Sequence, residues 1–236
     1  LPEIVTLETV EEKLGKISTI PVGVEKESLE VSTINLTDNV MFNITGDDIS
    51  SEPDFLDGFI RAINEVPAVK SFVLDAQSIL EEYNYSDCAN TRYQDGDVSE
   101  ALEELAQTIN AGIDAGTNNP IIVTLIGALT FQQKAADEQK AQFNCIVDVA
   151  KQCDNIRFII VETINNIKTI SFDPWYKNNS DMAEAIWIGN GIANQFTIKV
   201  TTAAKLLRAE VEPVFGYNIH KGKASLIKFI SGKERN

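Results

Sequence analysis

The sequence predicts an α/β fold with a mostly parallel sheet flanked by helices. Short apolar stretches alternate along the chain with stretches of ten or more residues that have helical periodicity. Two of the apolar stretches, residues 120–126 and 155–161, are almost continuously hydrophobic. Such stretches are typical of parallel strands that are buried on both faces.

The length and composition of the chain indicate one globular domain over residues 1–236. The 236 residues are 44% hydrophobic and 23% charged, values that are typical of folded proteins and exclude disorder or a coiled coil over the whole chain. We find no internal repeat and no linker that would divide the chain. The longest apolar stretch, residues 120–131, is shorter than the roughly 20 residues that a membrane-spanning helix needs.

The first half of the chain predicts strands that lead into helices. The first forty residues read as extended, and residues 30–36 alternate as a strand with one buried face does. A second strand over 39–45 leads to Gly46, and a helix then begins with Ser51 as N-cap, Pro53 in the first turn and Asp54 in a capping-box position. Residues 71–75 read as a short strand, 87–97 as a surface loop and 97–114 as an acid-rich helix.

The second half predicts two buried strands and several shorter elements. The strands are 120–126 and 155–161, and a long helix over 131–152 connects them. Three further strands are expected at 168–172, 185–188 and 195–200, followed by a short helix over 202–209 and a terminal hairpin that turns at 221–223.

The charge is strongly negative and unevenly distributed. The net charge is −15, and the part up to Asn118 carries −18 while the remainder carries +3. A nucleic acid would repel such a chain, so autonomous nucleic-acid binding is not expected. The basic residues of the last third either meet an adjacent domain or subunit or form a solvated face. They are Lys199, Lys205, Arg208, Lys221, Lys223 and Lys228.

The turn after the second strand has the position of a phosphate-binding loop but not its chemistry. The functional pattern is G-x-x-x-x-G-K-[ST], in which glycines allow backbone N–H groups to approach phosphate, lysine neutralises its charge and a hydroxyl holds Mg²⁺. The corresponding residues here are Gly46, Asp47, Asp48, Ile49, Ser50, Ser51, Glu52 and Pro53. An acid replaces the lysine and an imino ring replaces the hydroxyl, so the sequence predicts that no triphosphate binds.

A second feature of nucleotide hydrolysis is also missing, and simpler interpretations of the turn stay open. The strand 120–126 ends in Gly127-Ala128, where a hydrolase would place its Mg²⁺-organising acids. Gly46 could also simply join a strand to a helix, and the acids around it could form a solvated turn or hold a divalent cation. His220 has no candidate nucleophile partner, so no histidine-dependent triad and no other catalytic residue is predicted.

The last third of the chain, together with the altered loop, resembles a known family. The stretch 186–195 reads IWIGNGIANQ and is followed by FGY at 215–217 and KGK at 221–223. These segments resemble the C-terminal, third ATPase-like domain of the EssC/YukB coupling proteins of the Gram-positive type VII secretion system. That family belongs to the FtsK/SpoIIIE branch of the RecA-like, P-loop NTPase fold. The resemblance covers nearly the whole chain, with residues 1–28 as an entry segment from a preceding domain and 29–36 as the first strand.

The resemblance implies a function for the domain. A domain of this kind belongs to a membrane-anchored ATPase at the cytoplasmic face of the cell membrane, receives the C-terminal targeting segment of small helical exported proteins, and influences the upstream ATPase domains and homo-oligomer formation. ATP and Mg²⁺ are the family's cofactors, but the altered loop predicts a degenerate domain that binds neither and is not an enzyme. Two alternatives are an active or nucleotide-binding ATPase domain with an unconventional site and a purely structural assembly module.

Three aromatic residues are candidates for a peptide-binding groove. Trp175, Tyr176 and Trp187 lie in the part of the chain that carries the resemblance. An amphipathic helix that docks in an apolar groove is held by anchors at i, i+3 and i+4, and aromatic residues dominate binding hot spots. The alternative is that the three pack in the core or against a neighbouring domain.

Overall fold

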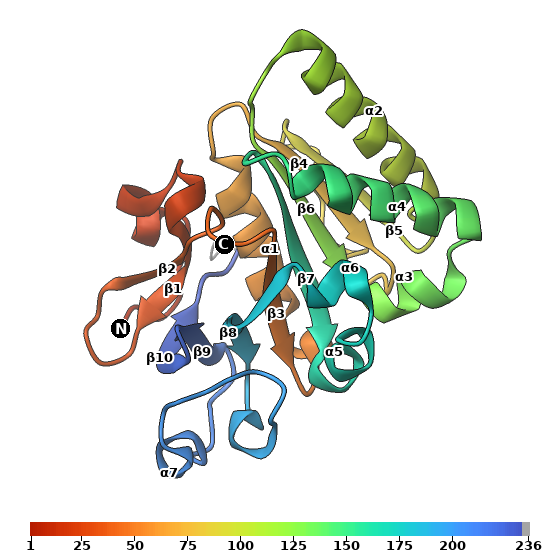
Figure 1. Ribbon diagram of the computed structural model, residues 1–236. Coiled ribbons are helices and arrows are strands. Elements are labelled where there is room, and N and C mark those ends of the chain that lie inside the picture. The colour runs from red at the N-terminus through yellow and green to blue at the C-terminus, as the bar shows by residue number, and fades with distance from the viewer. Residues whose placement is uncertain (233–236) are drawn as a thin grey trace.

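The computed structural model describes residues 1–232, and these form one ten-stranded sheet with helices on both faces (Figure 1). The strands are β1 (Ile20–Glu25), β2 (Val31–Ile34), β3 (Met41–Gly46), β4 (Lys70–Asp75), β5 (Thr91–Asp95), β6 (Ile121–Ile126), β7 (Ile156–Thr163), β8 (Ser180–Ile188), β9 (Phe215–His220) and β10 (Lys223–Phe229). The α-helices are α1 (Pro53–Asn64), α2 (Ser99–Ala115), α3 (Ala128–Lys134), α4 (Asp137–Ala150), α5 (Ile164–Ile170), α6 (Pro174–Lys177) and α7 (Ala204–Leu207).

The order of the strands divides the sheet into a parallel and an antiparallel part. The order is β2-β1-β10-β9-β8-β3-β7-β6-β4-β5. From β8 to β5 the neighbouring strands are all parallel, whereas β9, β10, β1 and β2 pair in antiparallel fashion. The mostly parallel α/β fold that the sequence predicts is therefore confirmed.

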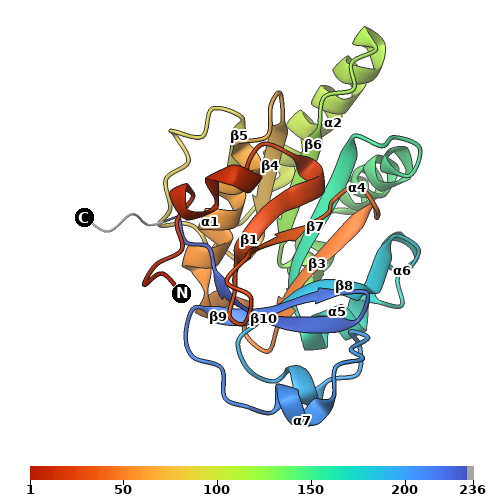
Figure 2. The same cartoon turned by 90° about the vertical axis from the view of Figure 1, so that its left-hand side faces the viewer.

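Two apolar layers, one on each face of the sheet, form the core. On one face, α1 and the N-terminal segment pack on the sheet through residues such as Phe55, Phe59 and Val10. On the other face, α2 to α6 cover the parallel strands, with Leu102 and Phe143 among the buried residues. Figure 2 shows α1 and α2 on different sides of the sheet. No helix within residues 1–232 combines the length and apolar character that a membrane span requires.

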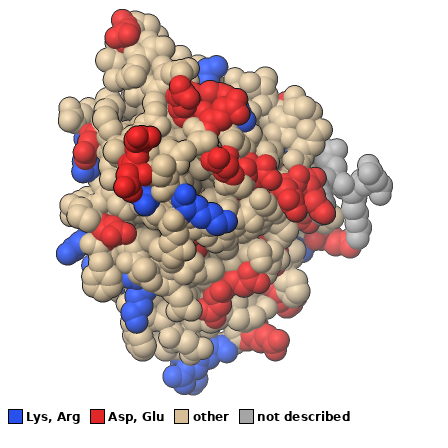
Figure 3. Space-filling view, turned by 90° about the vertical axis from the view of Figure 1, so that its right-hand side faces the viewer, with Lys and Arg blue, Asp and Glu red and all other residues tan. Residues whose placement is uncertain are grey.

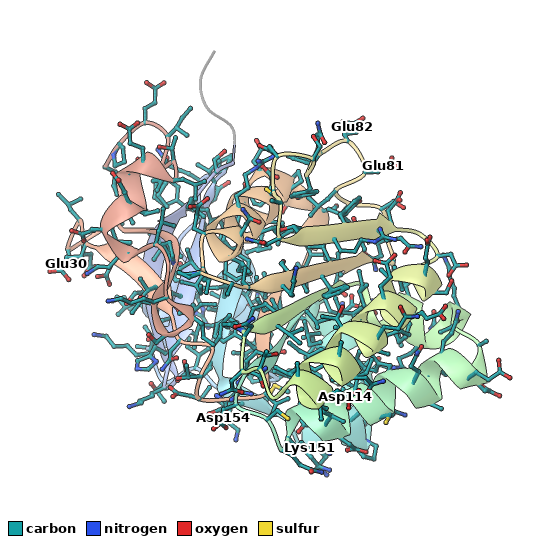
Figure 4. All side chains as sticks on the ribbon, turned by 90° about the horizontal axis from the view of Figure 1, so that it is seen from above. Glu30, Glu81, Glu82, Asp114, Lys151 and Asp154 are labelled. Carbon is teal, nitrogen blue, oxygen red and sulfur yellow. The ribbon has the colours of Figure 1, made fainter. Side chains whose placement is uncertain are left out.

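Amphipathic spacing explains α1 and α2. In α1, the buried apolar residues follow helical spacing, and Pro53 occupies the first helical position, where its missing N–H costs nothing. In α2, Leu102, Leu105 and Ile109 are buried on one stripe, and the helix ends at Gly116 in the left-handed conformation (φ +64°). Figure 4 shows α2 and α4 side by side, with Asp114 and Lys151 at their ends and Glu81 and Glu82 on a loop beside the sheet, all pointing outward.

Five local predictions were wrong. Residues 168–172 lie largely in α5, because Ile164, Ile167 and Ile170 are buried at helical spacing. Residues 195–200 form no strand, since the Gln195 side chain bonds the backbone N–H and C=O of Ile198 instead. The expected loop 87–97 contains β5, which pairs with β4.

The other two concern helix boundaries. The helix expected over 131–152 is divided into α3 and α4 at Ala135–Ala136, and the Gln139 side chain accepts the Ala136 N–H at 2.9 Å. Helix α1 begins one residue after Glu52, and Ser51, expected as its N-cap, ends a preceding 3₁₀ turn (Ile49–Ser51). Two further expectations at the N-terminus were wrong. The first forty residues contain 3₁₀ turns at Glu8–Lys13 and Ile17–Thr19 rather than extended chain alone, and the first strand is β1 (Ile20–Glu25) rather than residues 29–36, which contain β2.

The parallel strands place residues 46–53 and Gly127 at one edge of the sheet. Because parallel strands share a direction, the ends of β3, β7, β6 and β4 lie along the same carboxyl edge of the sheet. In open α/β sheets this is the edge at which ligands bind. In Figure 1 the edge faces the bottom of the picture, where α7 also lies.

Candidate functional site

The end of β3 is closely packed against its neighbour. Gly46 pairs with Thr163 on β7 and with Ile188 on β8. A Cβ at Gly46 would lie 2.7 Å from the Ile188 carbonyl oxygen, so only glycine fits there. The glycine that the sequence aligns with a phosphate-binding loop is therefore needed for the contact between strands.

Residues 46–53, which we call the acidic loop, use their polar groups within the chain. The Asp48 carboxylate accepts the Ser50 N–H at 2.8 Å and the Ser50 hydroxyl at 2.6 Å. The Ser51 hydroxyl donates to the Asp48 carbonyl at 2.9 Å. The exposed Asp47 carboxylate lies against Gly191, where a Cβ would overlap it. The side-chain oxygens that could meet a ligand are thus carboxylates that already bond or pack against the chain.

Glu52, which the sequence aligns with the lysine of a phosphate-binding loop, contacts a distant segment. Its carboxylate accepts the Val214 N–H at 2.8 Å. Val214 has φ +63°, a left-handed conformation that a β-branched residue rarely adopts. Burial raises the pKa of the Glu52 carboxyl, while the bond from Val214 acts in the opposite direction and nearby Asp54 acts in the same direction as burial. Pro53 begins α1 and has neither a hydroxyl nor an N–H to offer.

The charge around the acidic loop is unfavourable for phosphate. Within residues 1–232, no ion pair neutralises Asp47, Asp48 or Glu52. Two carboxylates within about 4 Å of a phosphate would each oppose it by several kcal/mol at an effective dielectric constant near 20. In the same range of residues, no group of three or more His, Cys, Asp and Glu side chains is placed to hold a metal ion.

The space beside Glu52 is small. A hollow of about 190 Å³ is lined by Glu52, Phe55, Val214, Phe229 and other residues of the N-terminal segment and β10. Sites for small molecules usually measure about 300–1,000 Å³. The first turn of α1 is also covered, because the Gly232 N–H donates to the Asp54 carbonyl at 3.3 Å.

The end of β6 is covered by a side chain from the next strand along the edge. Gly127 has φ +78°, and a Cβ there would lie 2.6 Å from Cγ of Gln77, which follows β4. The Gln77 amide donates to the Thr130 hydroxyl at 3.2 Å. The position that the sequence aligns with the Mg²⁺-organising acids of a hydrolase therefore carries a glycine with a glutamine packed over it.

Two buried acids at the same edge were not identified by the sequence analysis. Glu162, at the end of β7, accepts the N–H groups of Leu129 (3.0 Å) and Thr163 (2.8 Å). Asp75, at the end of β4, accepts the Leu80 N–H at 2.8 Å. Both side chains are fully buried. An acid at the end of a buried strand was the available signal, but both carboxylates hold the backbone of neighbouring segments.

The three candidate aromatic residues lie in the core. Tyr176 and Trp187 have no exposed surface, and Trp175 is 9% exposed. The Tyr176 hydroxyl donates to the Asn43 side chain at 2.7 Å, and the Trp187 indole N–H donates to the Asn190 carbonyl at 2.8 Å. Packing in the core was the alternative that the sequence left open, and it describes this structure. A peptide could reach Tyr176 or Trp187 only if the core around them opened.

The comparisons with known proteins agree on the fold. Neither a protein-family model nor a curated protein sequence matches the chain. Among solved structures, it resembles the cytoplasmic domain of EssC (14% identity, TM-score 0.70, covering 98% of this chain and 48% of that chain). It also resembles EssC ATPases 2 and 3 from Geobacillus thermodenitrificans (16% identity, TM-score 0.73, 98% and 45% covered).

A third similar structure is EccC ATPases 2 and 3 from Thermomonospora curvata in complex with a signal sequence peptide (14% identity, TM-score 0.69, 99% and 44% covered). The chain thus spans about half the length of these structures. The fold is similar to that of these EssC and EccC ATPase structures, and the resemblance to an EssC ATPase-like domain that the sequence indicates is confirmed at the level of the fold.

Proposed function

We propose that this chain is a non-hydrolysing recognition and regulatory domain of a type VII secretion coupling protein. Residues 1–236 would form one domain, with 1–28 leading from a preceding ATPase domain, at the cytoplasmic face of the cell membrane. Its partners would be small helical exported proteins, the upstream ATPase domains of the same chain and further copies in an oligomer. The net charge of −15 supports a protein partner rather than a nucleic acid.

One observation carries the non-hydrolysing part of the proposal. In the acidic loop, Glu52 stands where lysine would neutralise phosphate, and its carboxylate bonds the Val214 N–H. A triphosphate there would have to break this bond and would meet an anion that lacks a neutralising cation. The fold of an ATPase domain is thus retained, while the groups that would hold ATP and Mg²⁺ are replaced.

Calorimetric titration with Mg-ATP tests this part of the proposal. We expect no binding heat from the wild-type chain. Micromolar binding by the wild-type chain would contradict the proposal and favour a nucleotide-binding domain with an unconventional site.

Site-specific crosslinking of an exported helical protein to the intact coupling protein tests the recognition part. We expect crosslinks within residues 1–236. If deletion of this region disturbs assembly while all crosslinks map elsewhere, the domain is a structural assembly module and the recognition role is wrong.

A further inference from the structure

A long loop at the carboxyl edge is held closed at its base. Residues 189–214, which we call the β8–β9 loop, connect β8 to β9 and contain only short helical turns. The Asn190 side chain accepts the Val211 N–H at 2.7 Å and donates to the Val211 carbonyl at 3.3 Å. Long irregular loops in compact domains are usually functional. In the β8–β9 loop, hydrogen bonds between Asn190 and Val211 join the two ends.

The acidic loop contacts both ends of the β8–β9 loop. Asp47 lies against Gly191 just after the β8–β9 loop begins, and Glu52 accepts the N–H of Val214 where it ends. A carboxylate that accepts a backbone N–H makes a charge-assisted hydrogen bond, which is stronger than a neutral one. This bond helps to hold Val214 in its strained conformation. The residues that replace the phosphate-binding groups therefore position the base of the neighbouring loop.

The outer part of the β8–β9 loop exposes apolar surface. Phe196 is 95% exposed and Leu206 is 69% exposed. Phe196 also lines a hollow of about 280 Å³, together with apolar residues that include Ile192, Ile198 and Leu207. Contiguous exposed apolar surface usually marks an interaction site. Figures 1 and 2 show α7, which belongs to this loop, standing apart from the helices that cover the sheet.

The same surface carries basic groups. Lys199, Lys205 and Arg208 are exposed, and within residues 1–232 none of them has an ion-pair partner. The acids of the loop lie near its base, and one of them, Glu212, pairs with Lys26 at 3.9 Å. Figure 3 shows both basic and acidic side chains at the bottom of the molecule, the end where Figure 1 places α7. On a chain of net charge −15, this local cation group favours an acidic partner.

From these contacts we infer that the β8–β9 loop is a docking surface for an acidic, amphipathic helical segment of a protein, and that Glu52 is the positioning residue that holds it in its binding conformation. The inference rests on the proposed recognition function. Phe196, Leu206 and the hollow supply the apolar part of the contact, and the three cations supply the charge complementarity. Apolar anchors of the helix at i, i+3 and i+4 would meet Phe196 and the hollow, and its acids would meet the cations.

The first test measures the docking surface on the full chain. Its probe is a fluorescent helical peptide with leucines at i, i+3, i+4 and i+7 and glutamates elsewhere, and the matched probe has lysines in place of the glutamates. We expect the acidic peptide to bind at least about tenfold more tightly than the basic one, and Phe196→Ala to weaken it at least about tenfold. Phe172→Ala, which alters a residue 80% exposed outside the loop, should leave binding unchanged.

A charge-reversal variant and a matched control test the role of the basic residues. The double variant Lys205→Glu/Arg208→Glu should weaken binding of the acidic peptide by at least about tenfold, whereas Lys70→Glu, at the start of β4 and away from the loop, should not. Equal binding of both peptides, or equal effects of Phe196→Ala and Phe172→Ala, would overturn the docking surface.

The second test measures the positioning role of Glu52. Glu52→Ala should speed hydrogen exchange at the Val214 amide by about tenfold or more and weaken the acidic peptide, because the acceptor is lost. Glu52→Gln keeps an acceptor oxygen and should show a smaller effect, and Ser51→Ala, which lies beside Glu52 but does not contact the loop, should show none. Unchanged exchange and peptide binding in Glu52→Ala would overturn the positioning role.

The outcomes separate this inference from the proposed function. Crosslinks of an exported protein to other parts of residues 1–236, with peptide binding insensitive to Phe196→Ala, would overturn the docking surface and leave the recognition role intact. Peptide binding that depends on Phe196, with no crosslink anywhere in residues 1–236, would support the surface and contradict the proposed function.

Discussion

Two loops that lie against each other at the carboxyl edge of the sheet have opposite character. The carboxylates of the acidic loop form hydrogen bonds within the chain: Asp48 accepts the Ser50 N–H and Glu52 accepts the Val214 N–H. The β8–β9 loop instead exposes Phe196 and Leu206 together with basic side chains. The comparison teaches that the two loops have different roles in the structure. Asp47 and Glu52 of the acidic loop contact the base of the β8–β9 loop, while the outer part of that loop is exposed.

The largest expected effect separates the aromatic residues of the core from those of the β8–β9 loop. Trp187→Ala should lower the free energy of unfolding by about 4 kcal/mol, because a fully buried indole and its bond to the Asn190 carbonyl are lost. Phe196→Ala should change it by less than about 0.5 kcal/mol, because the ring is 95% exposed. Denaturant unfolding monitored by circular dichroism measures both values. Equal losses would show that Phe196 is buried in solution and would remove the contrast between core and surface.

The second prediction compares two glycines at the bases of the two loops. Gly46→Ala should cost about 3 kcal/mol, because its Cβ would meet the Ile188 carbonyl and β3 and β8 would have to separate. Gly189→Ala should cost about 1 kcal/mol, because only its positive φ (+65°) is unfavourable and no atom lies within 4 Å of its Cβ. The same unfolding measurement applies. A harmless Gly46→Ala would mean that the end of β3 is not closely packed.

Sequence reasoning predicted the parallel part of the sheet well, for a definite reason. Residues 120–126 and 155–161 are strands in the structure because their apolar residues satisfy both faces of the sheet, a signal that is local in the sequence. Residues 168–172 and 195–200 were predicted as strands, and both predictions were wrong. Their β-branched residues favour strands, but packing of Ile167 and Ile170 and the bonds from Gln195 decide their conformation.

The candidate site was predicted only in part. The replacement of lysine by Glu52 is visible in the sequence, because it departs from a pattern with fixed spacing. Its partner Val214 lies 162 residues away, so no local pattern reveals the contact. The same holds for Gln77 over Gly127, since the two positions meet only when β4 and β6 pair. The three aromatic candidates are buried in the core, because burial of large apolar rings stabilises the fold. The frequency of aromatic residues at binding surfaces does not show which of them are exposed.

The third prediction concerns the strained residue between the two loops. Val214→Gly should change the free energy of unfolding by less than about 1 kcal/mol. Glycine adopts φ near +63° without steric cost and retains the backbone N–H that Glu52 accepts, but it also has more freedom in the unfolded chain. Val214 is 40% exposed, so part of its apolar burial is lost as well. The matched control is Pro213→Gly, at an exposed neighbouring position, which should destabilise the chain by freeing its unfolded state. A larger loss of stability in Val214→Gly would show that its side chain contributes more than its backbone costs.

The smallest expected effect tests the electrostatic cost of Glu52 through pH. Burial raises its pKa in the folded chain, so folding favours the protonated form. The resulting contribution to stability is fully present below the ordinary glutamate pKa and is lost as the pH rises through the folded value. Relative to wild type, Glu52→Gln should therefore gain stability with rising pH across that window and then level off. The gain should stay below about 1 kcal/mol, because the side chain is only partly buried. Unfolding curves of both proteins across the acidic range measure the difference in their free energies of unfolding. The titration of other buried acids, such as Asp57, whose pKa burial also raises, cancels in this difference. A difference of the opposite sign would mean that the Val214 bond outweighs burial and that the ionised carboxylate stabilises the contact between the two loops.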